Sequence, residues 1–379
     1  MWIPYKEKFP KPKAIQINDV ISTLAMRGFA ILGAGLSGLT AAINLAKEGF
    51  KVDVYEINED VGVRFHGDLQ GLENWSKKKD ILEELKGANI EINFDCDPFS
   101  KVTVTDCSRT KEVNFERPLF YLVKRGPFPG TIDYGLKRQA LKSGVNIHFQ
   151  TTLPANEVDI VATGPISREV VGIVKGVIFR TDAKDTAIVA INDKLAFKGY
   201  SYLLVTKRYG CLCTVVLRDG VSRVNGYFEK TKQFFAEKLD LDTEPSKEVG
   251  GVGSFSFKNV FKKGATLYVG EAAGLQDFLW GFGMRFAVTS GYLAAQSIIS
   301  NKDYEKTVKR LLGNKLKACV VNRYLWENLL SEKDSSILID TAEFVKKNLY
   351  SMYNYNLLQR IIYPLALLNL KKKYPKPNS

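Results

Sequence analysis

The segment FAILGAGLSGLTAAINLAKEGFKVDVYEINE, residues 29–59, decides the fold of the domain that contains it. An apolar run from Phe29 to Leu32 predicts a short buried strand, and Gly33 follows where a tight turn must begin. At Gly35 the absence of a side chain lets the backbone approach a pyrophosphate, and Gly38 lets the next helix pack closely on the strand. The segment therefore predicts a strand, a glycine turn and a helix that together bind a dinucleotide.

The rest of the segment completes this dinucleotide-binding unit. Apolar residues at helical spacing from Leu39 onward predict a helix that ends at Gly49. The unpaired N–H groups and the positive dipole end of its first turn suit a phosphate. A second strand, residues 51–55, places Glu56 at its end, 18 residues beyond Gly38. A carboxylate there accepts both hydroxyls of a ribose and repels a 2′-phosphate, but it does not separate NAD from FAD.

Length and composition bound the remaining possibilities. A chain of 379 residues, 45% of them apolar, can bury a large core and is expected to form two or three domains. The longest apolar run, residues 361–370, is too short to span a bilayer. The N-terminus lacks the apolar core of a signal peptide, so we expect a cytoplasmic protein. Met26 would make a natural start, and residues 1–25 are interpreted as an N-terminal extension.

Cysteine content and charge restrict the function further. Five cysteines without a CxxC pair indicate neither a disulfide framework nor a dithiol flavin reductase, and we expect no metal site. The net charge is +13, and residues 301–379 hold 15 Lys or Arg against 7 Asp or Glu. Solvated surface is one interpretation, and peripheral contact with an anionic membrane surface is the other. No zinc-finger, RNA-binding or basic-helix pattern points to nucleic acid.

The order of the predicted elements indicates an α/β protein, α+β overall. After the first unit, residues 76–86 are predicted to be helical, and residues 168–260 alternate like an antiparallel sheet interrupted by one helix. We predict a discontinuous Rossmann-like domain, an inserted antiparallel-sheet substrate domain and a helical C-terminal region. Their limits are 26–85, 130–167 and 262–300 for the first, 86–129 and 168–261 for the second, and 301–379 for the third.

A late segment, ATLYVGEAAGLQDFLWGFGMRFAVTSGYLAAQSI at residues 265–298, completes the cofactor domain. A buried strand at 267–269 presents Gly270 and Glu271, and Gly281 and Gly283 open a helix rich in small residues. Together with the first unit and the strand–turn VATG at 161–164, this segment resembles the FAD-dependent geranylgeranyl reductase family within the p-hydroxybenzoate hydroxylase-like flavoproteins. The resemblance spans about 300 residues, and it implies FAD as the cofactor.

The resemblance also implies roles for individual residues. The pyrophosphate would lie at the glycine turn with Ser37, near Arg64, and the adenosine ribose at Glu56. Thr163 and Gly164 would pass close to the cofactor, Glu271 would hold the ribityl chain, and the helix that begins near Met284 would face the flavin. The implied cofactor-binding residues are Gly33, Gly35, Ser37, Gly38, Glu56, Arg64, Thr163, Gly164, Glu271, Gly281, Gly283 and Met284.

Departures from the family pattern leave the substrate open. Glu271 replaces the family's aspartate, and Phe278 and Trp280 replace its proline and small residue. With Tyr202, these two aromatic residues are predicted to line the substrate pocket. The arginine-then-aspartate pattern of the hydroxylases is loosened in KRGPFPGTID, residues 124–133.

Three functions are compatible with this sequence. The first is hydride transfer from reduced flavin to a carbon–carbon double bond of an isoprenoid lipid or quinone side chain, with His66 as the candidate proton donor. The second is flavin-dependent hydroxylation of a small substrate, and the third is flavin binding without catalysis. The electron donor is either NAD(P)H or a ferredoxin-like carrier. NAD(P)H would bind only transiently, because the sequence has no second glycine-rich dinucleotide-binding motif.

Overall fold

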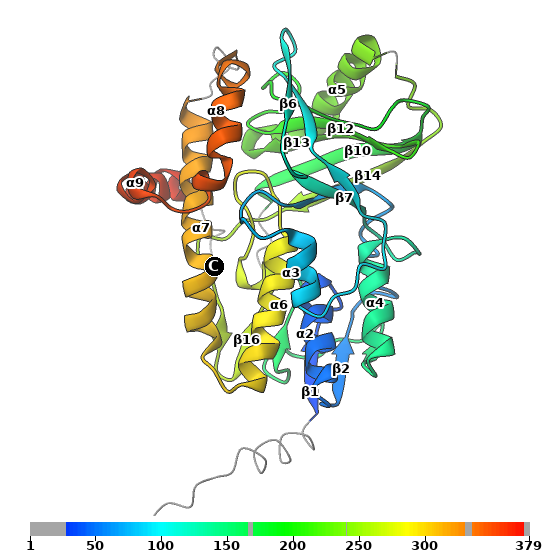
Figure 1. Ribbon diagram of the computed structural model, residues 1–379, viewed down its shortest axis with the longest axis vertical. Coiled ribbons are helices and arrows are strands. Elements are labelled where there is room, and N and C mark those ends of the chain that lie inside the picture. Colours follow the sequence, from blue (N-terminus) through cyan, green and yellow to red (C-terminus); the bar gives the residue numbers. More distant parts are fainter. Residues whose placement is uncertain (1–27, 166–169, 240, 330–335, 375–379) are drawn as a thin grey trace, which may run out of the picture.

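The structure is a computed structural model, and it describes residues 28–165, 170–239, 241–329 and 336–374. Residues 1–25, predicted to be an N-terminal extension, lie outside the described residues. The described chain forms three sheets, with helices on the first of them and a helical segment at the C-terminal end (Figure 1). This arrangement confirms the predicted α/β class.

The first sheet is mostly parallel and contains the dinucleotide-binding segment, residues 29–59. Its strands, in spatial order, are β15 (Lys262–Lys263), β16 (Thr266–Tyr268), β9 (Ile160–Val161), β1 (Phe29–Leu32), β2 (Val52–Tyr55) and β8 (Asn146–His148). Only β15 runs antiparallel to its neighbour. Segments from three distant parts of the sequence thus build one sheet, and the carboxyl ends of its central strands lie at one edge.

Three helices accompany this sheet: α2 (Leu36–Lys47), α4 (Ile132–Lys142) and α6 (Met284–Ile299). In Figure 1 they stand side by side in the lower half of the molecule. Helices α2 and α6 approach closely: a Cβ at Gly291 would lie only 2.1 Å from the carbonyl oxygen of Ser37, so a glycine is needed there. The small residues predicted in the late helix therefore serve the close crossing of two helices.

The second sheet has seven strands and is antiparallel except for one parallel pair, β5 with β11. Its strands, in spatial order, are β14 (Ser246–Gly253), β10 (Gly172–Arg180), β13 (Tyr209–Leu217), β12 (Tyr200–Thr206), β11 (Thr186–Ala190), β5 (Lys101–Thr105) and β6 (Thr110–Asn114). Helix α5 (Val224–Leu239) covers one face and buries Phe228 and Phe235 against it. The other face is left for contacts with the rest of the molecule.

A third, smaller sheet connects the two larger ones. It consists of β3 (Leu69–Glu73), β7 (Phe120–Lys124) and β4 (Asp97–Phe99). Two short 3₁₀ helices, Arg218–Arg223 and Gly270–Ala273, complete the connections. Because this sheet joins strands from both predicted domains, the residue limits of those domains stay a prediction.

Helix α3 (Ile81–Gly87) begins later than the sequence suggested. The prediction placed a helix over residues 76–86, but Asp80 caps the observed helix by accepting a hydrogen bond of 2.8 Å from the N–H of Leu82. Upstream of the cap, the guanidinium of Arg117 donates to the carbonyls of Asn74, Lys77 and Lys78. Those carbonyls are therefore bound by a side chain from elsewhere in the sequence instead of by a helix.

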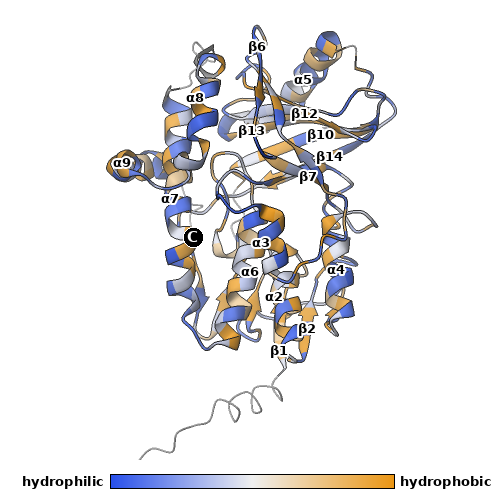
Figure 2. Ribbon diagram, viewed as in Figure 1, coloured by the Kyte–Doolittle hydropathy of each residue, from blue (hydrophilic) through white to orange (hydrophobic). Residues whose placement is uncertain are grey.

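The C-terminal region consists of α7 (Tyr304–Leu329), α8 (Ser336–Met352) and α9 (Leu357–Lys373). Helix α7 runs along the side of the molecule, from α6 to α8, and α9 projects sideways from it (Figure 1). Among the described helices, none combines the length and the apolarity that crossing a bilayer requires. Figure 2 shows both hydrophobic and hydrophilic colours on α9.

Candidate functional site

The glycine turn is held in the form that the sequence predicted. Gly33 has a φ of +104°, and a Cβ there would lie 2.5 Å from the carbonyl oxygen of Ala162. A Cβ at Gly38 would lie 2.0 Å from the carbonyl oxygen of Gly33, so α2 packs directly on the turn. A Cβ at Gly35, by contrast, would meet no atom closer than 4.0 Å, and Gly35 borders the cavity. Two glycines thus serve the fold, and the third leaves the backbone open to a ligand.

Glu56 lies at the end of β2, beside this turn. It is buried, and it accepts hydrogen bonds from the N–H of Ala34 at 2.8 Å and of Asn58 at 3.0 Å. The side chain of Asn58 also donates to it, at 2.6 Å. Because an ionised carboxylate has about four acceptor positions, Glu56 keeps capacity for a ribose hydroxyl while it ties the end of β2 to the glycine turn.

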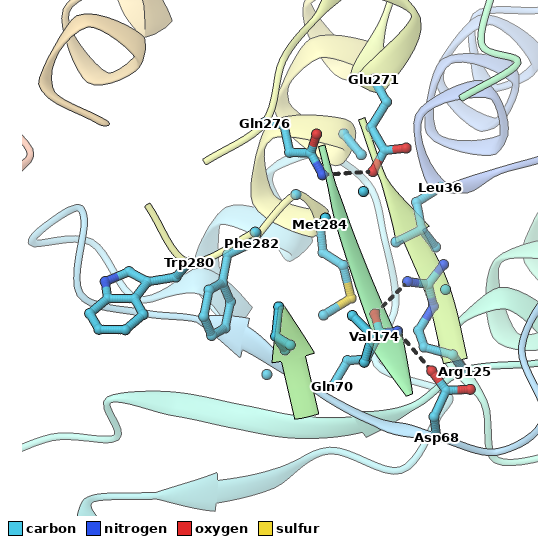
Figure 3. A pocket seen from close by; sticks show the side chains of 18 of the residues that line it. Leu36, Asp68, Gln70, Arg125, Val174, Glu271, Gln276, Trp280, Phe282 and Met284 are labelled. Atoms are coloured by element: carbon cyan, nitrogen blue, oxygen red, sulfur yellow. Dashed lines mark hydrogen bonds between the residues drawn. The ribbon is translucent and has the colours of Figure 1, made fainter. Parts of the chain in front are cut away.

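Next to the glycine turn, the cavity is lined by residues that follow β9 and by the late segment. Thr163 and Gly164 follow β9, and Gly164 has a φ of +80°. Glu271 faces Arg64 with 3.9 Å between Oε2 and Nη2, and the side chain of Gln276 approaches Glu271 to 3.5 Å. Figure 3 shows Gln276 and Glu271 together above the cavity. These polar groups surround the position that the resemblance gives to the phosphates and the ribityl chain.

Helix α6 directs its N-terminus at the same cavity. Gly281, with a φ of +80°, and Gly283, the N-cap residue, precede Met284, and all three line the cavity. No acidic residue occupies the first turn of this helix. The positive end of a 16-residue helix is therefore available to stabilise negative charge in the cavity.

A charged network that the sequence reasoning did not assign also lines the cavity. Arg125 donates two hydrogen bonds of 2.8 Å to Asp133. It also donates one of 3.0 Å to Gln70, which donates at 2.8 Å to Asp68 (Figure 3). Burial alone would lower the pKa of the Arg125 guanidinium, but the Asp133 carboxylate raises it, so Arg125 stays charged. Arg125 and Asp133 belong to the loosened segment KRGPFPGTID, where an arginine directly after an apolar strand was the available signal.

Beyond these polar groups, the cavity extends along the face of the seven-stranded sheet that α5 does not cover. Its volume is about 1620 Å³, larger than the roughly 300 to 1,000 Å³ of common small-molecule pockets. Aliphatic side chains from the sheet and from α7 and α8 line this part: Val102, Val104, Val174, Val189, Val215, Leu325, Val345 and Leu349. The cavity therefore has two parts. The polar part runs from Glu56 past the glycine turn to Glu271 and the N-terminus of α6, and we call it the cradle. The part lined by aliphatic side chains is called the apolar arm.

The three predicted pocket residues line the cavity. The ring of Trp280 packs on Trp326 with centroids 4.8 Å apart, and its carbonyl accepts a hydrogen bond of 2.5 Å from the hydroxyl of Tyr200. Tyr202 lies beside Tyr200 at 6.0 Å between ring centroids, and burial raises its pKa well above the ordinary value. Phe278 packs against neighbouring aromatic rings and is also part of the core.

The sequence reasoning also left the pair Asp277 and Tyr353 unassigned. The carboxyl group of Asp277 is buried and accepts a hydrogen bond of 3.0 Å from the hydroxyl of Tyr353, which lines the cavity. Burial raises the pKa of Asp277 to about 6. Trp75 packs edge-on against Phe282, with centroids 4.7 Å apart, and lies next to Tyr353. An isolated acid within the apolar segment GLQDFLWGFG was the sequence signal for this pair.

The structure brings most of the predicted residues together, with two exceptions. Gly38 lies under the turn, not on the cavity, as its packing role requires. His66 is exposed and does not line the cavity; its backbone N–H donates to Asp68 at 3.1 Å, and the chain turns at Gly67 with a φ of +104°. We therefore do not retain His66 as a proton donor.

Comparison with known proteins places this geometry in context. A family model for NAD(P)-binding Rossmann-like domains matches residues 31–69, which hold the glycine turn and Glu56. No curated protein matches the chain in sequence. Solved structures, however, match it over most of its length.

Three of these structures are informative. A geranylgeranyl bacteriochlorophyll reductase-like protein from Thermoplasma acidophilum is 19% identical with a TM-score of 0.65, over 91% of this chain and 98% of that one. A flavin-dependent brominase is 15% identical with a TM-score of 0.63, over 92% and 100%. A 2-methyl-3-hydroxypyridine-5-carboxylic acid oxygenase is 16% identical with a TM-score of 0.57, over 82% and 93%.

The fold and the comparisons together define a class. The chain shares its fold with this reductase-like protein, this flavin-dependent brominase and this oxygenase, and in the chain itself a Rossmann-like sheet is joined to an antiparallel sheet. At the level of the fold, this confirms the resemblance to the geranylgeranyl reductases within the p-hydroxybenzoate hydroxylase-like flavoproteins.

The residues present also fit FAD. The cradle runs without interruption from Glu56, past the open glycine turn, to Glu271 and the N-terminus of α6. It supplies a carboxylate for the ribose, backbone N–H groups for the pyrophosphate and a positive helix end for the flavin. The extra volume beside it leaves room for a second molecule.

Proposed function

We propose that this chain holds FAD in the cradle and is a flavin-dependent oxidoreductase that reduces carbon–carbon double bonds of an isoprenoid lipid or quinone side chain. One observation carries the choice of substrate: the cradle opens into a long cavity arm lined by aliphatic and aromatic side chains. Such an arm suits an extended apolar chain better than a small polar ring, because aliphatic walls offer few hydrogen bonds.

Under this proposal each cradle residue has a defined task. Glu56 and the glycine turn hold the adenosine half, and Arg64, Thr163, Gly164 and Glu271 flank the phosphates and the ribityl chain. FAD, once the electron donor has reduced it, would supply the hydride that the substrate takes up. The N-terminus of α6, with Gly281 and Gly283, stabilises negative charge at the reduced flavin.

The apolar arm positions the substrate and excludes water. Tyr202, Trp280 and Phe278 line the same cavity, in which the double bond must lie close to the cofactor for the reaction to occur. For the proton that completes the reduction we propose Tyr353, whose hydroxyl is hydrogen-bonded to Asp277. A carboxyl group with a pKa of about 6 can return a proton to that hydroxyl near neutral pH.

The other functions stay open alternatives. Flavin-dependent hydroxylation of a small substrate is supported by the likeness to an oxygenase fold, and flavin binding without catalysis requires only the cradle. The electron donor is either NAD(P)H or a ferredoxin-like carrier. The net charge of +13 on this chain would attract an acidic carrier protein. A cytoplasmic location, peripheral to the membrane that would hold a lipid substrate, agrees with this proposal.

Anaerobic reoxidation distinguishes these functions. The purified protein is reduced without oxygen and mixed with a geranylgeranyl lipid, while the flavin spectrum is followed. We expect the oxidised spectrum to return without air and mass spectrometry to show hydrogen added in pairs. A protein that stays reduced until air is admitted, and then yields a hydroxylated product, is a monooxygenase. A protein that yields no product with either treatment only binds flavin.

A further inference from the structure

Helix α9 exposes a continuous apolar stripe. Five large aliphatic side chains lie on it at helical spacing and are 58 to 74% exposed: Leu357, Leu358, Ile361, Leu365 and Leu368. We call these five residues the outer stripe. An exposed apolar stripe of this length on one helix is a marker of an interaction surface, because single exposed leucines are common but contiguous ones are not.

The helix is nevertheless held firmly by its opposite face. Gln359, Ala366 and Leu370 are buried, and the side chain of Gln359 donates at 2.9 Å to Asn322 of α7 and at 2.7 Å to the carbonyl of Met352. Asn356 and Gln359 form a reciprocal capping box at the start of the helix. The outer stripe is therefore presented by an ordered helix that already has its packing partners.

The charge around the stripe has one sign. From Phe344 to the end of the sequence there are seven Lys or Arg and no Asp or Glu. On α9 itself, Arg360 and the exposed Lys371 and Lys372 lie along and beside the stripe. An apolar stripe bordered by cations matches the interface of an anionic bilayer, where aliphatic side chains enter the acyl region and cations meet the headgroups.

We propose that the outer stripe of α9 docks on the surface of an anionic lipid bilayer. The helix lies in the plane of the interface and does not cross it, since its 17 residues include several charges. This inference rests on exposure and charge alone and does not depend on the reaction proposed above.

The position of α9 adds a consequence that does rest on the proposed function. Met352 and Tyr353 line the cavity, and α9 begins four residues after Tyr353. Asn322, which contacts Gln359 of α9, lines the cavity as well. A docked protein would therefore hold this side of its cavity close to the membrane, from which an apolar substrate can enter.

Vesicle flotation tests the docking. Full-length protein with its cofactor is mixed with vesicles of phosphatidylcholine alone or with phosphatidylglycerol, at low and high salt. The test variant is Ile361→Asp with Leu365→Asp. The matched control is Leu141→Asp with Leu311→Asp, which changes two comparably exposed leucines on other helices and adds the same charge.

We expect the unaltered protein and the control to float with anionic vesicles and to float less at high salt. The test variant should bind at least about tenfold more weakly, because two aliphatic side chains can no longer enter the acyl region. Equal flotation of the test variant, or equal binding to phosphatidylcholine alone, would overturn the proposal. So would a dimer in light scattering that the test variant dissociates, without any vesicle binding, since the stripe would then contact a second copy.

Activity on detergent-dispersed lipid separates this inference from the reaction. The test variant should keep that activity, because the outer stripe does not line the cavity. Flotation without activity would refute the proposed reaction and leave the docking intact.

Discussion

The hydroxyl of Tyr353 donates a hydrogen bond of 3.0 Å to the carboxylate of Asp277, although the two residues are 76 positions apart in the sequence. Asp277 belongs to the loop before α6, and Tyr353 follows α8. The pair connects the flavin side of the cavity to the C-terminal helices. Both side chains are almost fully buried, so water cannot substitute for either partner.

Replacement of Tyr353 by phenylalanine tests the proposed proton donor. We expect Tyr353→Phe to slow substrate-driven reoxidation of the reduced flavin about 100-fold, because general acid catalysis contributes at least that factor. The amount of bound flavin should not change. Tyr304→Phe is a matched control, since Tyr304 also loses a buried hydrogen bond, to the carbonyl of Tyr268 at 2.9 Å, but does not line the cavity. Similar rates for both variants would remove Tyr353 from the mechanism.

The raised pKa of Asp277 predicts a dependence of stability on pH. Because its pKa is about 6 in the folded protein and 3.8 ordinarily, the folded state binds more protons between about pH 4 and pH 6. The contribution of Asp277 to the free energy of unfolding therefore falls as pH rises through that window. Tyr353, Cys319 and Glu73 face this carboxyl group and add their own interactions.

Comparison with Asp277→Asn isolates this contribution. We expect the variant to gain about 1 to 3 kcal/mol relative to the unaltered protein between pH 4 and pH 7, since one pKa unit corresponds to about 1.4 kcal/mol. Denaturant unfolding at several pH values measures the difference. Parallel stability curves for the two proteins would show that the pKa of Asp277 is not raised.

The glycine turn offers a pair of variants that separates binding from folding. A Cβ at Gly38 would lie 2.0 Å from a backbone oxygen, so we expect Gly38→Ala to lower the free energy of unfolding by about 2 to 4 kcal/mol. A Cβ at Gly35 meets nothing within 3.9 Å, so Gly35→Ala should leave the stability of the cofactor-free protein within about 0.5 kcal/mol.

Gly35→Ala should nevertheless weaken FAD binding about tenfold or more, because the methyl group occupies the path of the pyrophosphate. Unfolding must be measured without cofactor, since bound FAD itself stabilises the folded state. Gly226→Ala, on helix α5 where a Cβ meets nothing within 4 Å, serves as the control for FAD affinity. Full FAD affinity in Gly35→Ala would mean that the cofactor does not cross the turn at this residue.

Narrowing of the apolar arm tests the substrate class. Val345 lies on α8 and lines the arm, so Val345→Trp should shorten it. We expect the variant to lose most activity on a geranylgeranyl chain and to keep activity on a shorter prenyl chain, measured by anaerobic reoxidation. Leu141→Trp, on the distant helix α4, should alter neither. Unchanged activity on the long chain would show that the substrate does not occupy this arm.

Local parts of the site could be predicted because their determinants are close together in the sequence. Gly33, Gly38 and Glu56 lie within one strand–turn–helix–strand unit, whose geometry follows from backbone sterics and packing of neighbouring elements. The late glycines at 281 and 283 and the start of the following helix were predictable for the same reason. Helix α3 was placed too early, because the carbonyls before it are bound by Arg117, more than 30 residues away.

The contacts between distant segments could not be predicted in this way. Hydrophobic periodicity says which face of an element is buried, but it does not say against what. The packing of separate elements decides three features of the site. His66 does not line the cavity, Glu271 lies near Arg64, and Asp277 pairs with Tyr353.

The sequence by itself determined the dinucleotide-binding unit, the α/β class and the position of the late cofactor segment, since each follows from interactions within a few tens of residues. Only the tertiary structure decided the shape of the apolar arm, the partner of each buried charge and the exposure of the outer stripe on α9. The physical reason is that burial belongs to no single segment. A leucine pattern predicts a helix, but whether its side chains meet protein or solvent is set by the surfaces that the rest of the chain brings to it.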